Sequence, residues 1–170
     1  MIGTRVERVA IDIKLLLEGG NAFVNPKELL EDLSAEQATH RFDQAHTIAE
    51  IIAHLRYWQS WFYEGATGSP RAYPTSGDDS WFTVEPEAWE KVRTEFLAGL
   101  ESIITLCDDT ELLHQPFAQG SIAAGGHDKR TVGTTLLYMV ALHNAHHYGQ
   151  IVTLRQLLGA WPPRAGGKVW

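Results

Sequence analysis

Residues 131–159 read TVGTTLLYMVALHNAHHYGQIVTLRQLLG. Apolar residues recur in this stretch at helical spacing, which predicts one long amphipathic helix. Trp161-Pro162-Pro163 follows closely. Because proline cannot continue a helix, we expect the helix to end near Gly159. Three histidines fall within five positions of this helix, at 143, 146 and 147. The helix face on which each one lies decides whether they can form a site.

Three more long helices are predicted by the same periodicity and by the Gly and Pro residues between the apolar runs. They cover residues 4–18, 47–64 and 86–107. Thr47 and Glu50 form a capping box at the start of the second of these helices. A short helix is expected to begin at Pro26, since proline suits a first helical position. Residues 67–83 and 108–130 are predicted to be irregular connections.

The chain has 170 residues and shows no strand-like alternation of useful length. We therefore predict one all-α domain over residues 1–170, a four-helix bundle with long connections. The net charge of −7 argues against a nucleic-acid partner bound through its phosphates. Cys107 is the only cysteine, which excludes an intrachain disulfide. The first residues lack a secretory pattern, and no run of about 18 apolar residues occurs. We expect a cytoplasmic protein without a membrane partner.

The helical repeat indicates which histidines point inward. A helix advances roughly 100° per residue, so His143 and His147 lie one turn apart on the same face. On this wheel both fall within the apolar stripe, and Gln150 shares it. His146 lies on the flank of the stripe, and Tyr148 lies further round. The stretch is therefore expected to contain two inward histidines rather than three equivalent ones.

A third inward histidine, His54, lies at the centre of the apolar stripe of the helix predicted over residues 47–64. A lone buried histidine is usually structural, because an imidazole in an apolar interior needs a hydrogen bond or a metal ion. Three that converge from two helices favour a metal site. Three histidine ligands also leave a fourth position for water or substrate, as in catalytic zinc sites. We predict that His54, His143 and His147 bind a divalent ion, with Zn²⁺ favoured over Ni²⁺ or another divalent ion.

Other residues are less promising for chemistry. Asn144 replaces the glutamate of an H-E-x-x-H motif, which disfavours a zinc peptidase. His46 is expected to pack at the start of its helix, and Cys107 to be a small buried thiol rather than a nucleophile. For Arg155, a solvated role is at least as plausible as contact with an anionic substrate.

The segments HTIAEIIAHLRYW (46–58) and HNAHHYGQIVTLRQLLGAWPP (143–163) resemble the two signature regions of the DinB/YfiT-like superfamily. The resemblance implies an up-down-down-up four-helix bundle and, for many members, a homodimer. It also implies a metal held by one histidine of the second helix and the His-x-x-x-His pair of the fourth, which are His54, His143 and His147 by position. Some members are S-transferases or isomerases that use low-molecular-weight thiols such as bacillithiol or mycothiol.

Two kinds of function are compatible with these residues. The first is a metal-dependent enzyme acting on a small-molecule substrate, most simply a thiol-dependent S-transferase, with a metal-dependent hydrolase as the variant that activates water. Gln150, and also Glu50 or Tyr148, would orient the thiol, the substrate or the imidazoles. The second is a non-catalytic metal-binding stress-response module. Surplus aromatic residues outside the helical stripes, such as Trp81 and Phe82, are the only local support for the homodimer.

Overall fold

A computed structural model of the chain describes residues 5–20, 23–117, 130–164 and 166, with only the backbone described for residues 5–11. Within these ranges the protein is all-helical, and the one β pairing is an isolated antiparallel bridge between Pro116 and Thr131. The predicted all-α class is confirmed. The long helices are α1 (Arg5–Glu18), α4 (Ile48–Ala66), α5 (Trp89–Leu106) and α8 (Leu142–Leu157).

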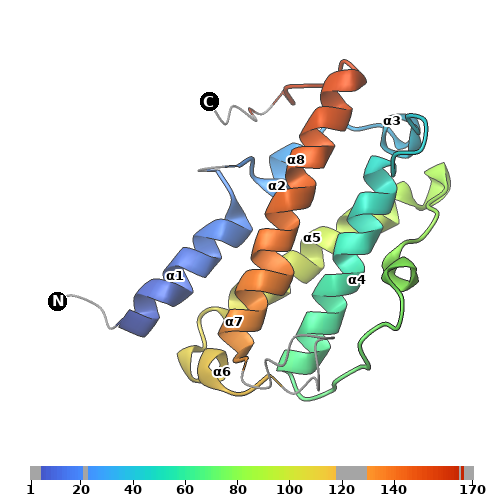
Figure 1. The fold of residues 1–170 in the computed structure, drawn as a ribbon. Helices are drawn as coiled ribbons and strands as arrows, with labels where there is room; N and C mark the ends of the chain where they lie inside the picture. Colours follow the sequence, from blue (N-terminus) through green and yellow to red (C-terminus); the bar gives the residue numbers. More distant parts are fainter. Residues whose placement is uncertain (1–4, 21–22, 118–129, 165, 167–170) are drawn as a thin grey trace.

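The four long helices run up, down, down and up in chain order (Figure 1). The connection after α4 returns along the side of the molecule before α5 begins, so α4 and α5 run in the same direction. α8 follows α7 (Val132–Leu136) and a π-helical turn, Leu137–Ala141, without a break. The single helix predicted over residues 131–159 is therefore correct in extent, but it contains one wider turn.

Local sequence signals account for the helix ends. The Thr47 hydroxyl accepts a hydrogen bond from the Glu50 amide at 3.1 Å, and the Glu50 carboxylate accepts one from the Thr47 amide at 3.0 Å. This is the predicted capping box. α1 ends before Gly19, whose φ of +69° favours glycine and where a Cβ would lie 2.6 Å from the Val24 carbonyl oxygen.

Two short helices were not expected from periodicity. α3 (Ala35–Thr39) begins with a capping box formed by Ser34 and Gln37. α6 (Thr110–His114) lies in the stretch predicted to be irregular, so that prediction is wrong there. Both helices are only five residues long, too short to show an apolar period, and their caps are the signal that could have revealed them. α2 (Pro26–Leu29) begins at the predicted proline.

The core consists of two apolar clusters. The first contains α4 residues up to Leu55 and α8 residues from Tyr148 onward. The second contains α4 residues from Trp58 onward and, from the last helical segment, residues up to Ala141. The gap between the two clusters therefore falls at the same level on both helices. His54 on α4 and His143 and His147 on α8 occupy that level.

Arg155 is 1% exposed and joins three parts of the chain. Its guanidinium donates hydrogen bonds to the carbonyl oxygens of Leu29, Glu31 and Ala160. These bonds fasten α2 and the turn after α8 to the last helix. The solvated or substrate-binding role considered for Arg155 is therefore wrong, because every donor group lies against backbone.

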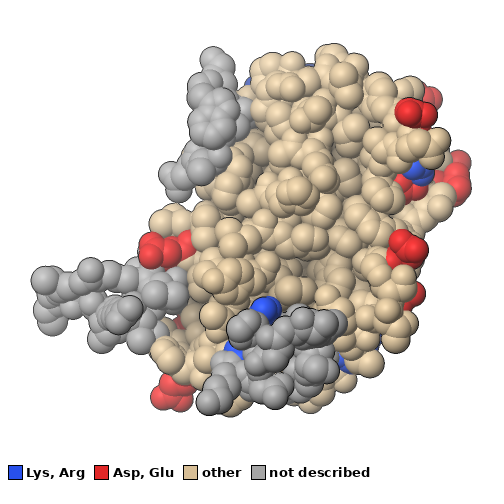
Figure 2. All heavy atoms as spheres, in the orientation of Figure 1, with Lys and Arg blue, Asp and Glu red and all other residues tan. Residues whose placement is uncertain are grey.

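Figure 2 shows no charged side chain over the middle of α8; acidic groups lie toward the edge of the view, and basic atoms appear lower down, beside the atoms drawn in grey. Arg155 is the only Asp, Glu, Lys or Arg in residues 132–157, and it is buried. No helix among the described residues is both long and apolar enough to span a bilayer.

Candidate metal centre

The structure brings three histidine rings together in the gap between the two core clusters. His54 comes from the middle of α4, and His143 and His147 come from successive turns of α8. The Nε2 atom of His143 lies 3.2 Å from Nε2 of His54 and 3.0 Å from Nε2 of His147. All three candidate ligand nitrogens lie within 4.8 Å of one another, and His54 and His147 are buried.

Hydrogen bonds on the far side of two of these rings fix their orientation. Nδ1 of His54 lies 3.2 Å from the Ser80 carbonyl oxygen, and Nδ1 of His147 lies 2.7 Å from Oε1 of Gln150. Both partners are acceptors, so each Nδ1 carries the proton and donates. The Nε2 atoms of His54 and His147 consequently present lone pairs toward the centre of the group.

Proton counting then limits what the third ring can do. A neutral His143 has at most one N–H, so its Nε2 can donate to His54 or to His147 but cannot satisfy both close contacts fully. If its proton lies on Nδ1 instead, three lone pairs face one another. Nδ1 of His143 is buried and has no hydrogen-bond partner among the described residues. A cation at the centre would remove this conflict, because it accepts all three lone pairs.

Burial keeps the three imidazoles neutral. Desolvation, followed by the charge of His147, lowers the pKa of His54 to about 4. Desolvation, followed by the charges of His147 and His54, lowers the pKa of His143 to about 3. Desolvation is also the main cause that lowers the pKa of His147. Neutral imidazole is the form that binds metal ions, so the group is ready to act as a ligand set at neutral pH.

Aromatic rings cover the site. The indole of Trp81 stacks on His54 with ring centroids 3.9 Å apart and planes 8° from parallel. Its other face stacks on His46 at 3.7 Å. Trp58 meets both His54 and His143 edge to face. Trp81, which lies outside the helical stripes, therefore contacts the site, a role that its position in the sequence did not predict.

Three residues were expected to orient groups at the site: Gln150, Glu50 and Tyr148. The structure places them in different surroundings. Gln150 contacts His147 as described, but its side chain lies at an exposed rim rather than on the inward stripe. Glu50 is 5% exposed and binds the Thr47 amide, Arg41 and His46, so it reaches His54 only through His46 and Trp81.

Tyr148 points away from the histidines. It is 1% exposed, and its ring packs against Phe23 and Phe96. Its hydroxyl accepts a hydrogen bond from Asn144 at 3.3 Å. The expectation that Tyr148 orients substrate or imidazoles is therefore not supported by its contacts, which are those of a core residue.

The π-helical turn is one reason that a simple wheel misplaced these residues. A π-helical turn contains more residues than an α-helical turn, so it rotates every later residue relative to the earlier ones. The buried face of α8 consequently includes Asn144 and Tyr148, while Gln150 reaches the rim. His143 and His147 remain on one side, because both follow the turn and keep the α-helical spacing.

The remaining candidates are outside the group. His46 packs at the start of α4, as expected, with its imidazole 3.6 Å from the Glu50 carboxylate. His146 is exposed and lies 3.2 Å from Nε2 of Gln150. Cys107 is buried, and desolvation raises the pKa of its thiol to about 11, which makes it a poor nucleophile.

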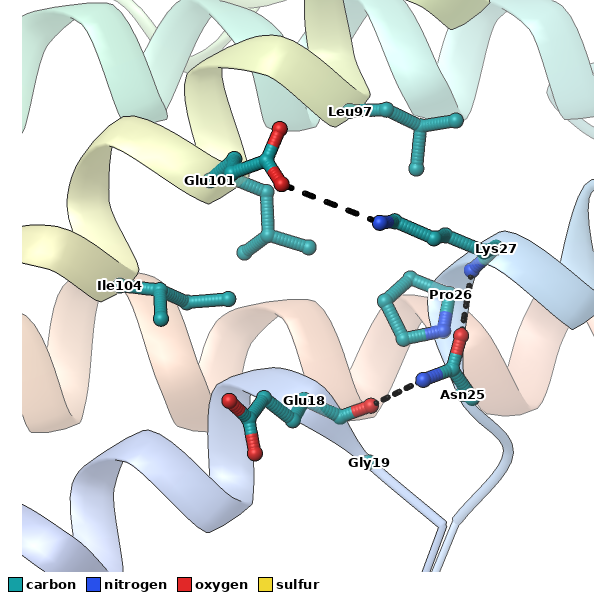
Figure 3. Close-up of a pocket in the computed structure, with 9 residues that line it drawn as sticks. Glu18, Gly19, Asn25, Pro26, Lys27, Leu97, Glu101 and Ile104 are labelled. Carbon is teal, nitrogen blue, oxygen red and sulfur yellow. Dashed lines mark hydrogen bonds and ion pairs between the residues drawn. The ribbon is translucent and has the colours of Figure 1, made fainter.

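Two hollows outside the histidine group are relevant to ligand binding. One of about 390 Å³ reaches the outer side of the site, since His46 and Gln150 are among its lining residues. The other, of about 400 Å³, lies where α1, α2 and α5 meet (Figure 3). Its polar groups already bind each other: Lys27 pairs with Glu101 at 3.9 Å, and Asn25 donates to the Glu18 carbonyl oxygen at 2.9 Å. It contains no histidine or cysteine, so we do not place the chemistry there.

Comparison with known protein families matches the DinB superfamily over residues 26–151. This range contains the whole of α4 and α8 as far as Ile151, and therefore all three histidines. Comparisons with curated proteins and with solved structures found no match.

The depressed histidine pKa values predict a pH-dependent stability for the metal-free protein. An unfolded histidine takes up its proton near pH 6.5, whereas His54 and His143 in the folded state resist protonation down to about pH 4 and 3. The unfolded state therefore binds more protons in this window. The free energy of unfolding should fall as pH drops below about 6.5, by up to roughly 1.4 kcal/mol per pH unit for each histidine.

Urea denaturation in the presence of a chelator, at several pH values, measures this slope. His143→Leu should make it shallower, because it removes one of the buried histidines whose pKa is lowered. Equal slopes for the wild type and His143→Leu would contradict the assignment.

Proposed function

The chain belongs to the DinB superfamily, and we propose that it binds a divalent metal ion through Nε2 of His54, His143 and His147. The observation that carries the proposal is the convergence of three neutral imidazoles whose close contacts their own protons cannot satisfy. The spacing also fits. Two nitrogens bound to tetrahedral zinc lie roughly 3.3 Å apart, close to the 3.0 and 3.2 Å measured between the Nε2 atoms.

We propose Zn²⁺ as the ion, with Ni²⁺ or another divalent ion as alternatives, since imidazole nitrogens suit each of them. When bound by three neutral ligands, such an ion keeps its full positive charge and lowers the pKa of a thiol or water that reaches it. The protein's own groups hold the ligands in place. Gln150 accepts from His147 and the Ser80 carbonyl accepts from His54, while Trp58 and Trp81 keep bulk water from the rings.

We further propose that the protein is a thiol-dependent S-transferase acting on a small-molecule electrophile. The histidine group contains no carboxylate, and Glu50 is already bound to the helix cap and to Arg41. The ion can ionise either ligand, but a thiol starts from a pKa of about 8.5 and water from about 15.7, so a thiol needs a much smaller shift to be fully ionised at neutral pH. This favours thiol transfer over the metal-dependent hydrolase. A non-catalytic metal-binding module remains the second alternative.

We also propose that the protein pairs with a second copy through the exposed side chains of α7–α8, which include no Asp, Glu, Lys or Arg, although the Arg130 guanidinium lies 5.8 Å from the Tyr138 ring centroid. Two copies with a net charge of −7 repel each other least where that charge is absent. Tyr138 and Leu142 are 54% and 44% exposed on this segment and would supply apolar contact area.

Metal content should depend on the three histidines. Untagged wild-type protein should carry about one ion per chain, because three ligands form one site. His143→Gln or His147→Gln should lose it, and His54→Gln should weaken binding by more than about 100-fold. Elemental analysis after dialysis measures the occupancy. His146→Gln is the matched control and should keep the ion, so an empty site in that variant together with a full site in His147→Gln would refute the ligand set.

Activity should require both the ion and a thiol. Zn²⁺-loaded protein should consume low-molecular-weight thiols in the presence of an electrophile, and a chelator should abolish the reaction. Gln150→Ala should slow it by about 10- to 100-fold, since partners of metal-bound histidines have effects of this size. The rate of thiol loss is the measurement. Ester or amide hydrolysis without thiol would favour the hydrolase, and a metal-bound protein inert in both assays would favour the non-catalytic module.

Self-association should depend on the α7–α8 face. Wild-type protein should sediment as a dimer at micromolar concentration, and Leu142→Glu should shift it to the monomer, because it places a negative charge on the proposed interface. Tyr63→Glu adds the same charge to an exposed aromatic position on α4 and should leave the dimer intact. A wild-type protein that sediments only as a monomer would rule out the pairing.

A further inference from the structure

Two consecutive residues of the connection between α4 and α5 hold one histidine of the site. The Ser80 carbonyl oxygen accepts from Nδ1 of His54, and the Trp81 indole covers the face of the same ring. The carbonyl fixes which nitrogen carries the proton, and the indole fixes the plane of the ring. His147 differs, because its Nδ1 partner, Gln150, lies on its own helix. Only His54 takes its partner from a distant segment.

Local hydrogen bonds fold this segment onto itself. The Asp79 carboxylate accepts from the amides of Thr75 and Ser76 at 3.1 and 3.0 Å and from the Thr75 hydroxyl at 3.2 Å. The Ser80 hydroxyl donates to the Gly77 carbonyl oxygen at 3.0 Å. Residues 77–80 form one 3-10 turn as a result. The position of the Ser80 carbonyl therefore depends on the Asp79 side chain, although Asp79 does not touch the site.

Trp81 is anchored on its far side as well. Its second face stacks on His46, whose imidazole lies 3.6 Å from the carboxylate of the buried Glu50. Glu50 in turn caps α4, the helix that carries His54. The indole thus lies between the imidazole of His46, just before α4, and that of His54, within α4. Moving the indole out of this position would break both stacking contacts.

We propose that residues 75–81 act as a clamp that positions His54 for metal binding, with Asp79 and Trp81 as positioning residues. The inference rests on the proposed metal site and adds a reciprocal coupling to it. A clamp that raises metal affinity must itself be stabilised by the bound metal to the same degree. The connection between α4 and α5 is then part of the metal site in energetic terms.

Zn²⁺ affinity, measured by competition with a chromophoric chelator, tests the clamp. Asp79→Ala should bind Zn²⁺ about 10- to 100-fold more weakly than the wild type, the range known for residues that orient metal ligands. Asp78→Ala is the matched control, because it removes the same charge one residue away without breaking the bonds to Thr75 and Ser76. It should bind like the wild type. Metal-free Asp79→Ala should unfold only a few degrees below metal-free Asp78→Ala, because it loses one local cap and no core contact.

Trp81 provides an independent pair of variants. Trp81→Leu removes the stacked ring and should weaken Zn²⁺ binding, whereas Trp81→Phe keeps an aromatic face on His54 and should restore most of the affinity. If Asp79→Ala fails to fold, this pair decides the question. A structural defect alone would not be rescued selectively in metal affinity by the aromatic substitute.

Hydrogen exchange adds a readout that is separate from affinity. Zn²⁺ should slow amide exchange in residues 75–81 of the wild type and of Asp78→Ala, and should do so far less in Asp79→Ala. If the wild type binds Zn²⁺ and all variants bind it equally, the clamp is wrong and the metal site stands. If the wild type binds no divalent ion, the proposed function and the clamp fail together.

Discussion

Three imidazole nitrogens meet at the centre of this bundle with too few protons to satisfy their contacts. The Nδ1–H groups of His54 and His147 are turned outward to carbonyl oxygens, which leaves their Nε2 lone pairs facing His143. In water such a cluster would gain a proton, but burial lowers the pKa of each ring and prevents this at neutral pH. A fold that keeps this arrangement needs a cation at its centre or spends packing energy on a polar conflict. The rest of the architecture can be understood as support for that group.

The order of the helices explains how residues distant in sequence come to contact His54. Because α4 and α5 run in the same direction, the chain must travel the length of the bundle between them. That long connection passes beside α4 and supplies Ser80 and Trp81 to His54. A short turn between antiparallel helices could not have reached the middle of α4. The core is divided accordingly, with apolar clusters above and below the histidines providing the burial that the polar group itself cannot provide.

Sequence reasoning worked where the signal is local. The capping box of Thr47 and Glu50, the stop at Gly19 and the one-turn spacing of His143 and His147 each depend on a few neighbouring residues, and the structure has all three. It failed where position depends on distant contacts. No periodicity could place Trp81 against His54, because the contact crosses 27 positions of sequence from helix to loop. The π-helical turn caused a different error. A helical wheel assumes one constant rotation per residue, so it placed Tyr148 away from the buried face of α8.

The ligand set limits the chemistry that the site can perform. The donor set is defined by geometry, and it consists of neutral rings without a carboxylate among them. A bound ion would therefore keep its charge, and an anionic ligand such as a thiolate would neutralise it without competition from the protein. Glu50, the acid expected near the site, is instead used to cap α4 and to hold His46 against Trp81. An acid fixed in this way supports the orientation of His54 and is not free to take a proton from water. A metal ion held by the three histidines would then have to supply, through its own charge, the shift that deprotonates an incoming ligand.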